Sequence, residues 1–159
     1  AHRKTLQYGR FYRNDTPKMN KVYWKTVSPD RSRSIAGVFQ TQAQAAESND
    51  ILPLSGLDEA KRYRMQTKNQ RVFVRRFGGL VNHLLPFPIN PNGMLFRWAD
   101  RLYALKDCVE TYTASGKTLL QGVHLNKQFV ATGYNEQIRM LGDFGSNLYA
   151  IEETAELHA

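Results

Sequence analysis

Residues 22–41, VYWKTVSPDRSRSIAGVFQT, decide the fold class of this sequence. Residues 22–27 and 34–41 are rich in β-branched and aromatic side chains, a composition that favours strands. Between them, residues 28–32 are of the types that form turns. The stretch therefore predicts a β-hairpin.

Similar strand signals recur along the rest of the chain. Residues 61–65 and 71–75 alternate charged and apolar side chains, the pattern of strands with one buried and one solvated face. Short strands at close spacing favour a sandwich or barrel over a parallel sheet. We predict an all-β fold, an antiparallel β-sandwich or Greek key, over residues 22–154, followed by a tail at 155–159.

The N-terminal residues predict a different element. Residues 1–13 have fair helix propensity, and an apolar stripe is formed by Leu6, Phe11 and Tyr12. Residues 14–21, with Pro17, have the composition of a loop. We predict a short N-terminal helix at 1–13 and a linker at 14–21.

The last strand is expected to close the sandwich by burying Phe144, Leu148 and Ile151. These positions do not share one face of a strand, so we expect a turn or bulge near Gly145. After it, the pattern places Leu148 and Ala150 on one side and Tyr149 and Ile151 on the other.

Composition and charge narrow the function classes. The 159 residues, 42% hydrophobic and 23% charged, suit one globular domain, and the net charge is +8. Residues 1–79 hold sixteen Lys and Arg against six Asp and Glu. The densest basic segment, Lys61 to Arg76, fits the solvated faces of strands or a nucleic-acid-binding patch, and we favour the first. The apolar region 80–105 is too interrupted for a membrane helix, so we expect a cytoplasmic protein or a piece of one.

No motif predicts a cofactor or metal site. Cys108 is the single cysteine, and the histidines have no ligand spacing: His2, His83, His124 and His158. Gly116-Lys117-Thr118 matches the end of a phosphate-binding loop, but position 111 is Thr where that loop needs Gly. We therefore predict no cofactor-binding residue and no metal-binding residue.

Catalytic chemistry is also not indicated. The following aspartates lie at turn-like positions or strand ends, without a sign that two converge: Asp30, Asp58, Asp100, Asp107 and Asp143. No serine lies in a nucleophile motif, and Cys108 has no basic neighbour except Lys106. From its residues alone the chain is predicted to hold no catalytic residue.

An ordered set of segments resembles the C-terminal region of glycoside hydrolase family 36 α-galactosidases, in particular those of lactic acid bacteria. In chain order they are Gly9–Arg13, Trp24–Asp30, Leu52–Asp58 with Tyr63, Ser115–Gly122 and Gly142–Tyr149. The sequence departs from the family at Leu120, where Met is usual, and in the loop at residues 16–20, which is more commonly acidic.

The resemblance implies a non-catalytic β-sandwich domain of a cytoplasmic enzyme that removes terminal α-galactose from sugars such as melibiose or raffinose. The two catalytic carboxylates of that retaining mechanism would belong to a preceding TIM barrel. Residues 1–13 would then be the end of the last barrel helix. The barrel would be the partner of this domain, in a parent enzyme that is expected to be a homo-oligomer without cofactor.

Two other functions remain open at this point. A carbohydrate-binding module would need Trp24, Tyr63 or Trp98 exposed as a platform for sugar rings, although strand alternation favours core positions for at least two of them. A nucleic-acid-binding domain would use the cluster from Lys61 to Arg76.

Overall fold

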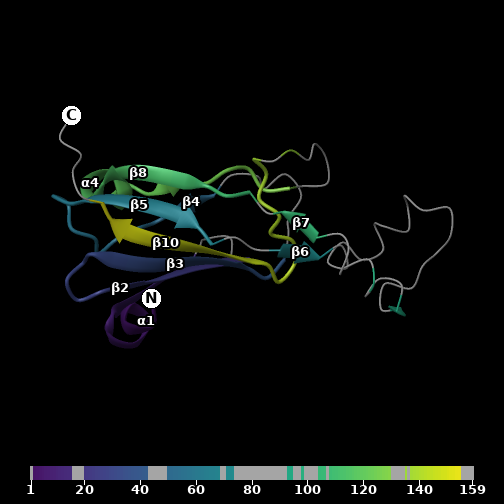
Figure 1. The fold of residues 1–159 in the computed structure, drawn as a ribbon, viewed down its shortest axis with the longest axis horizontal. Coiled ribbons are helices and arrows are strands. Elements are labelled where there is room, and N and C mark those ends of the chain that lie inside the picture. Colours follow the sequence, from purple (N-terminus) through teal and green to yellow (C-terminus); the bar gives the residue numbers. More distant parts are fainter. Residues whose placement is uncertain are drawn as a thin grey trace. The chain divides into compact units, whose positions relative to one another are not determined.

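The computed structural model describes residues 2–15, 20–42, 50–68, 71–73, 93–94, 98, 104–106, 108–129, 135 and 137–154 (Figure 1). The chain separates into two compact units. One comprises residues 1–68 and 108–159, and the other comprises residues 69–107. In the second unit, β6 (Arg71–Phe73) pairs antiparallel with β7 (Ala104–Lys106).

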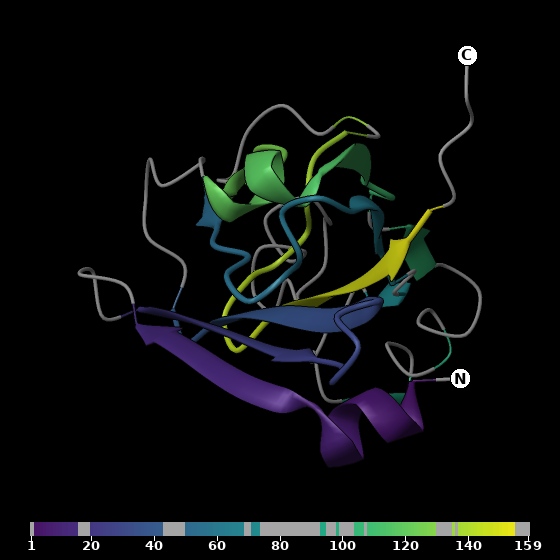
Figure 2. The ribbon, with the colours of Figure 1, turned by 90° about the vertical axis from the view of Figure 1, so that its left-hand side faces the viewer.

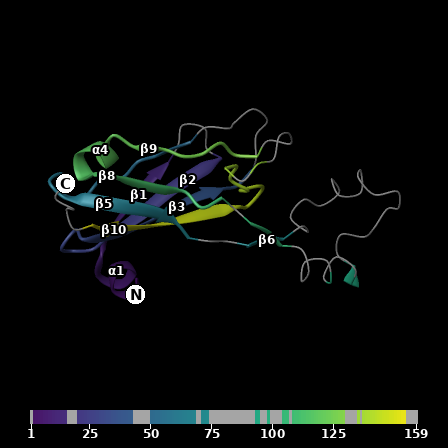
Figure 3. The same ribbon diagram turned by 45° about the horizontal axis from the view of Figure 1, so that its top comes forward.

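The larger unit is built on a six-stranded antiparallel sheet. Its strands are β1 (Arg10–Asp15), β2 (Lys21–Val27), β3 (Arg33–Gln40), β5 (Arg62–Thr67), β8 (Thr111–Ser115) and β10 (Ser146–Glu153). Their order across the sheet is β1-β2-β3-β10-β5-β8. The C-terminal strand β10 therefore lies inside the sheet, between β3 and β5 (Figure 1; Figure 3 shows the same strands turned by 45°).

The predicted hairpin is confirmed as β2 and β3, which pair from Lys21 with Gln40 to Val27 with Ser34. Their connection is held by Asp30, whose carboxylate accepts hydrogen bonds from both Ser28 and Ser32. Ser28 in turn accepts a hydrogen bond from the backbone N–H of Arg33 through its Oγ. The turn chemistry read from the sequence thus fixes the register of the hairpin.

A second layer covers one face of this sheet. It consists of the two-stranded ladder of β4 (Ile51–Leu52) with β9 (Val123–His124) and the short helix α4 (Gly116–Leu120). Leu52 and Leu119 of this layer join Tyr63, Met65 and other sheet residues in one apolar core. The all-β antiparallel sandwich is therefore confirmed. We call the covered side of the sheet the core face and the opposite side the outer face.

The N-terminal helix is shorter than predicted. Helix α1 spans Arg3–Tyr8, and from Arg10 the chain runs as strand β1. Phe11 and Tyr12 thus point to opposite faces of a strand, and the predicted helical stripe that joined them to Leu6 does not form. Tyr12 packs against the core, whereas Phe11 is exposed. Pairing with β2 overrides a helix propensity that is marginal at this length.

The closing strand β10 confirms one prediction and corrects another. Tyr149 and Ile151 are buried on the core face, and Leu148 and Ala150 lie on the outer face, which confirms the predicted division into two sides and the burial of Ile151. Leu148, which was predicted to be buried with Phe144 and Ile151, is only half-buried there, so that prediction was wrong. Phe144, however, is 84% exposed in a turn with φ +51° and does not enter the core. The predicted turn near Gly145 exists, but it directs the Phe144 side chain outward.

Other expectations fall where the structure gives no description. The tail at 155–159, most of the region 80–105 and the side chains of 71–76 lie outside the described residues. Of the helices described, none is long and apolar enough to cross a membrane.

Candidate functional site

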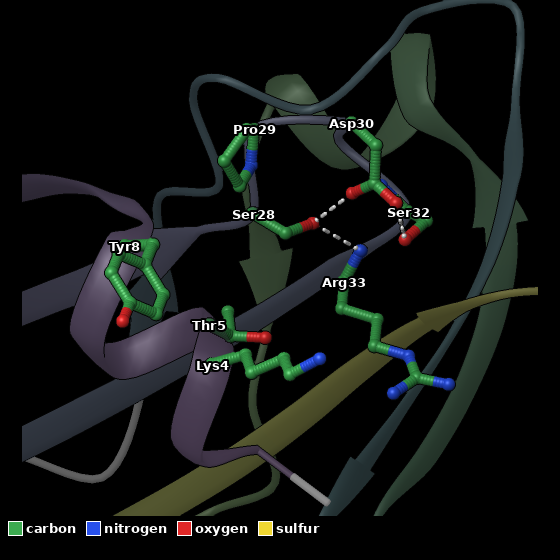
Figure 4. A pocket seen from close by; sticks show the side chains of 8 residues that line it. All are labelled: Lys4, Thr5, Tyr8, Ser28, Pro29, Asp30, Ser32 and Arg33. Atoms are coloured by element: carbon green, nitrogen blue, oxygen red, sulfur yellow. Dashed lines mark hydrogen bonds between the residues drawn. The ribbon is translucent and has the colours of Figure 1, made fainter.

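An open cleft of about 460 Å³ lies between α1 and the β2–β3 turn (Figure 4). Lys4, Thr5 and Tyr8 of the helix form one wall, and residues 28–30, 32 and 33 form the other. Its one carboxylate, Asp30, accepts hydrogen bonds at 2.5 Å from Ser28 Oγ and at 2.7 Å from Ser32 Oγ. These bonds hold the pKa of Asp30 well below its ordinary value. Asp30 therefore stays ionised as the anchor of the turn and has no second carboxylate in this cleft with which to share acid–base work.

A neighbouring cleft of about 370 Å³ contains two carboxylates, Glu152 and Glu153, together with Ser32 and Arg33. The glutamates are consecutive residues of β10, so their side chains point to opposite faces of the strand. Glu153 also forms an ion pair with Lys61 at 2.9 Å. This arrangement does not place two carboxylates on either side of a substrate bond.

The remaining carboxylates with strong interactions are in the core. Asp50 binds Lys21 Nζ at 2.6 Å and Arg139 Nη2 at 2.5 Å, and all three side chains are buried. Burial alone would raise the pKa of Asp50, but the hydrogen bonds and charges of Arg139 and Lys21 outweigh it and keep this pKa below its ordinary value. Asp50 is thus a buried anion between two cations.

Glu110 forms a second buried site next to this cluster. Its carboxylate accepts hydrogen bonds at 2.8 Å from both Tyr112 and Tyr149, and a third from the backbone N–H of Asn126. Burial, reinforced by the nearby Glu110 carboxylate, raises the pKa of both tyrosines above their ordinary range. Arg139 connects the two sites, because its Nε donates to the carbonyl of Asn126 at 2.7 Å. The sequence gave no motif for this network, whose members lie far apart in the chain.

A further buried charged side chain is that of Lys25, on the core face of β2. Lys25 Nζ donates a hydrogen bond to the carbonyl of Pro53 at 3.1 Å and lies 5.3 Å from the centre of the Tyr12 ring. Burial lowers the pKa of Lys25 to about 8. Its contacts are a carbonyl and an aromatic ring, so it serves to connect β1, β2 and the 53–58 loop.

The described aromatic side chains on the outer face form a stripe across β1, β2 and β3. The ring centre of Trp24 lies 6.2 Å from that of Phe11 and 5.4 Å from that of Phe39, with which it is stacked. Trp24 pairs with Gly37, and the Phe39 ring lies in the space that a side chain at Gly37 would fill. Trp24 therefore has an aromatic neighbour on each side.

This geometry disfavours a platform for sugar rings built on Trp24 or Tyr63. Trp24 is half-buried, its ring is stacked with that of Phe39, and the Phe11 ring lies tilted beside it, so Trp24 is not an open platform for a sugar ring. Tyr63 is buried, and its hydroxyl donates to the carbonyl of Arg31 at 2.7 Å. Trp98, in the smaller unit, is 68% exposed. Of the three aromatics only Tyr63 is in the core, so the prediction of at least two core positions was wrong.

The charged side chains of the basic segment Lys61–Arg76 that the structure describes do not all lie on one face. Arg62 and Arg64 are exposed on the outer face and alternate with the buried Tyr63 and Met65, as predicted for a solvated strand face. Lys61 is engaged by Glu153 and by the carbonyl of Asp30. The charges therefore do not form one continuous basic patch within the described part of this segment.

Several segments of the family resemblance meet at one end of the sandwich. The Tyr63 hydroxyl accepts a hydrogen bond from the backbone N–H of Asp58 at 3.0 Å and donates to the carbonyl of Arg31, which directly follows the segment Trp24–Asp30. Gly116 lies against the Asp58 backbone with no room for a side chain, and its N–H donates to the carbonyl of Lys61. Gly116 is thus part of a packed junction and Lys117 is exposed beside it, so the resemblance to a phosphate loop is accidental.

Comparison with known families explains this ordered set of structural segments. The model of the glycosyl hydrolase family 36 C-terminal domain matches residues 21–151. The chain belongs to this family. The matched region contains in full four of the five segments that carry the resemblance. It lacks only Gly9–Arg13, which is at the junction of α1 and β1.

The similar proteins of known name are α-galactosidases. α-Galactosidase AgaA of Geobacillus stearothermophilus is 35% identical over 65 residues, which are 40% of this chain and 9% of that protein. The solved structure of an α-galactosidase from Lactobacillus brevis has a TM-score of 0.58 at 20% identity, over 99% of this chain and 15% of that one. For AgaB of G. stearothermophilus the TM-score is 0.52 at 22% identity, over 96% of this chain and 14% of that one. The chain thus spans a small part of the length of these relatives, which share its fold.

Proposed function

We propose that this chain is the C-terminal, non-catalytic domain of a longer α-galactosidase, in which a preceding TIM barrel carries the catalytic carboxylates. The family match over residues 21–151 is the observation that carries the proposal. The share of the relatives that the chain covers, 14–15% in the solved structures, is too small to include such a barrel.

The described carboxylates support a role outside catalysis. Asp30 anchors a turn, Asp50 and Glu110 are buried in hydrogen-bonded networks, and Glu153 pairs with Lys61. A retaining glycosidase needs two carboxylates facing one substrate bond, about 5–5.5 Å apart. The two clefts described above offer no such pair.

For the parent enzyme we propose hydrolysis of terminal α-D-galactosides of the melibiose and raffinose type. Solved structures of two AgaA variants from G. stearothermophilus are complexes, one with raffinose and one with stachyose, which supports this proposal. A cytoplasmic location and a homo-oligomeric parent belong to the same proposal. Cell fractionation and light scattering on the native enzyme test these two points.

The experiment uses an antibody against the 159-residue chain. We expect it to precipitate α-galactosidase activity from the source cells and to recognise, on a denaturing gel, a single polypeptide several times longer than this chain. The purified chain itself should not hydrolyse a chromogenic α-galactoside.

Pre-immune serum is the control for the precipitation, and a buffer blank is the control for the assay. Two results would contradict the proposal. One is a recognised polypeptide without activity, and the other is turnover by the purified chain that survives repurification and scales with protein concentration.

A further inference from the structure

The outer face of the six-stranded sheet is almost uncovered by the described residues. Helix α1 packs at one end of it, where Thr26 is buried (Figure 2). Every other described side chain of this face is half-buried or exposed, and Phe11 is 60% exposed. The core face, by contrast, is closed by β4, β9 and α4. The second layer therefore covers one side of the sheet, and the outer face, which we also call the open side, is almost uncovered by the described residues.

One half of the open side is largely apolar, and Arg13, in register with Trp24, is the one charged side chain described there. The stripe of Phe11, Trp24 and Phe39 crosses β1 to β3, and the remaining apolar positions border it. These are Val22, Ile35, Leu148 and Ala150. Contiguous apolar surface on a sheet face is uncommon in a protein that works alone and marks an interaction surface. Because the rings pack side by side, the stripe is preformed and loses little side-chain freedom on association.

The other half of the open side is cationic. Arg62 and Arg64 extend from β5, and Arg33 lies in register with Glu152 of β10. Glu152 is the one carboxylate among the described side chains of this face. A second copy of the chain would bring the same excess of arginines into the contact, which costs free energy. The charge therefore favours a different partner whose surface carries carboxylates.

We propose that the outer face of the six-stranded sheet is the docking surface for the rest of the α-galactosidase polypeptide, which meets it with an apolar surface bordered by carboxylates. This inference rests on the proposed function, because the missing 85% or so of a relative's length supplies the occupant. Contacts between domains of one chain commonly bury about 600–1,500 Å², an area that the face of a six-stranded sheet can provide.

The test measures the accessibility of single introduced cysteines. Phe11→Cys places a thiol on the outer face, and Lys117→Cys places one on exposed α4, which belongs to the opposite layer. Each variant is made in the 159-residue chain and in the full-length polypeptide, and is labelled with a bulky maleimide. Cys108 is buried, and the parent proteins measure its background reaction.

We expect labelling at position 11 to be at least tenfold slower in the full-length polypeptide than in the 159-residue chain. Labelling at position 117 should be equal in both. Equal rates at position 11 would overturn the proposal. Slow labelling already in the 159-residue chain would do so as well: dependence on protein concentration would identify a second copy as the occupant, and independence would identify a segment of the chain itself.

α-Galactosidase activity of the full-length polypeptide is measured on the same samples. Activity without protection at position 11 refutes the docking surface and leaves the proposed function standing. Protection without activity refutes the proposed function and supports docking to the rest of the polypeptide. A charge variant, Arg64→Glu, is expected to accelerate labelling at position 11 in the full-length polypeptide, since it replaces a cation opposite the proposed carboxylates. Lys117→Glu, which makes the same charge change on α4, should leave that rate unchanged.

Discussion

The two faces of the central sheet differ in the interaction partners that their side chains have. On the core face, even the charged groups have partners, as Asp50 does with Lys21 and Arg139. On the outer face, the large aromatics Phe11, Trp24 and Phe39 have mainly one another. Both faces are built from the same strands by simple alternation. The difference separates a core whose side chains are buried by a second layer from an apolar surface that, among the described residues, only helix α1 partly covers.

The largest effect is expected from breaking the buried charge network. Asp50→Asn leaves Lys21 and Arg139 buried without their anion, which should lower the free energy of unfolding by about 3–5 kcal/mol. Glu152→Gln on the outer face removes the same charge and should cost less than about 0.5 kcal/mol. Urea unfolding of the three proteins measures the contrast. A loss below about 1 kcal/mol for Asp50→Asn would contradict the prediction, because it would mean that the buried Lys21 and Arg139 do not depend on this anion.

The pH dependence of Asp50 has a definite sign. Because its pKa is lower in the folded chain than the ordinary 3.8, its contribution is present above that pH and is lost as the pH falls through the folded value. Asp50→Asn should therefore flatten the acid limb of the stability curve relative to wild type.

A second contrast compares two apolar side chains near the ends of one segment. Ile151→Ala opens a cavity on the core face and should cost about 2–5 kcal/mol. Phe144→Ala removes a ring that is already in water and should change the free energy of unfolding by less than about 0.5 kcal/mol. Denaturant unfolding at constant slope tests both. A large loss at Phe144 would restore the original sequence-based prediction that this ring is buried.

A smaller effect tests the buried cation on the core face. Since the folded pKa of Lys25 is about 8 against 10.5 in the unfolded chain, the unfolded state holds an extra proton between these values, and stability rises with pH there. The rise ends near pH 10, because the raised pKa values of Tyr112 and Tyr149 act in the opposite direction. Lys25→Met should remove the rise. Parallel stability curves for the two proteins between pH 8 and 10 would show that Lys25 titrates normally.

The smallest expected effect is the binding of nucleic acid to the outer face. The dispersed arginines of the outer face, Arg62 and Arg64, should give only non-specific binding, with Kd of about 10⁻⁴–10⁻⁶ M at physiological salt. Fluorescence anisotropy with labelled DNA and RNA measures it across a salt series. Sub-micromolar binding at physiological salt would instead favour a nucleic-acid-binding function for this face.

The sequence predicted what depends on local chemistry. The β2–β3 hairpin follows from strand composition and from Ser28, Asp30 and Ser32 in the turn, and the alternation around Tyr63 and Met65 follows from period-two burial. Tyr149 and Ile151 were placed on the correct side for the same reason. Such features need only neighbouring residues to specify them.

What depends on distant contacts was not predictable in this way. Phe11 and Tyr12 became strand residues because β2 was available for pairing, which no local propensity reports. Phe144 is apolar and adjacent to a strand, but its positive φ turns it outward. The partnership of Asp50 with Arg139 joins residues 89 apart in sequence, and without geometry a buried aspartate cannot be distinguished from one that caps a turn.

The position of β10 has a consequence for how this domain is made. β10 comes latest in the chain among the strands of this sheet and lies between β3 and β5, so each of these two strands has an unpaired edge until β10 is made. On the ribosome, the region up to β8 is therefore a nascent chain with two exposed edges and an incomplete core, since Tyr149 and Ile151 are still missing. The sheet is therefore completed only once residues 146–153 have emerged, and a chain truncated before Ser146 is expected to expose the edges of both β3 and β5.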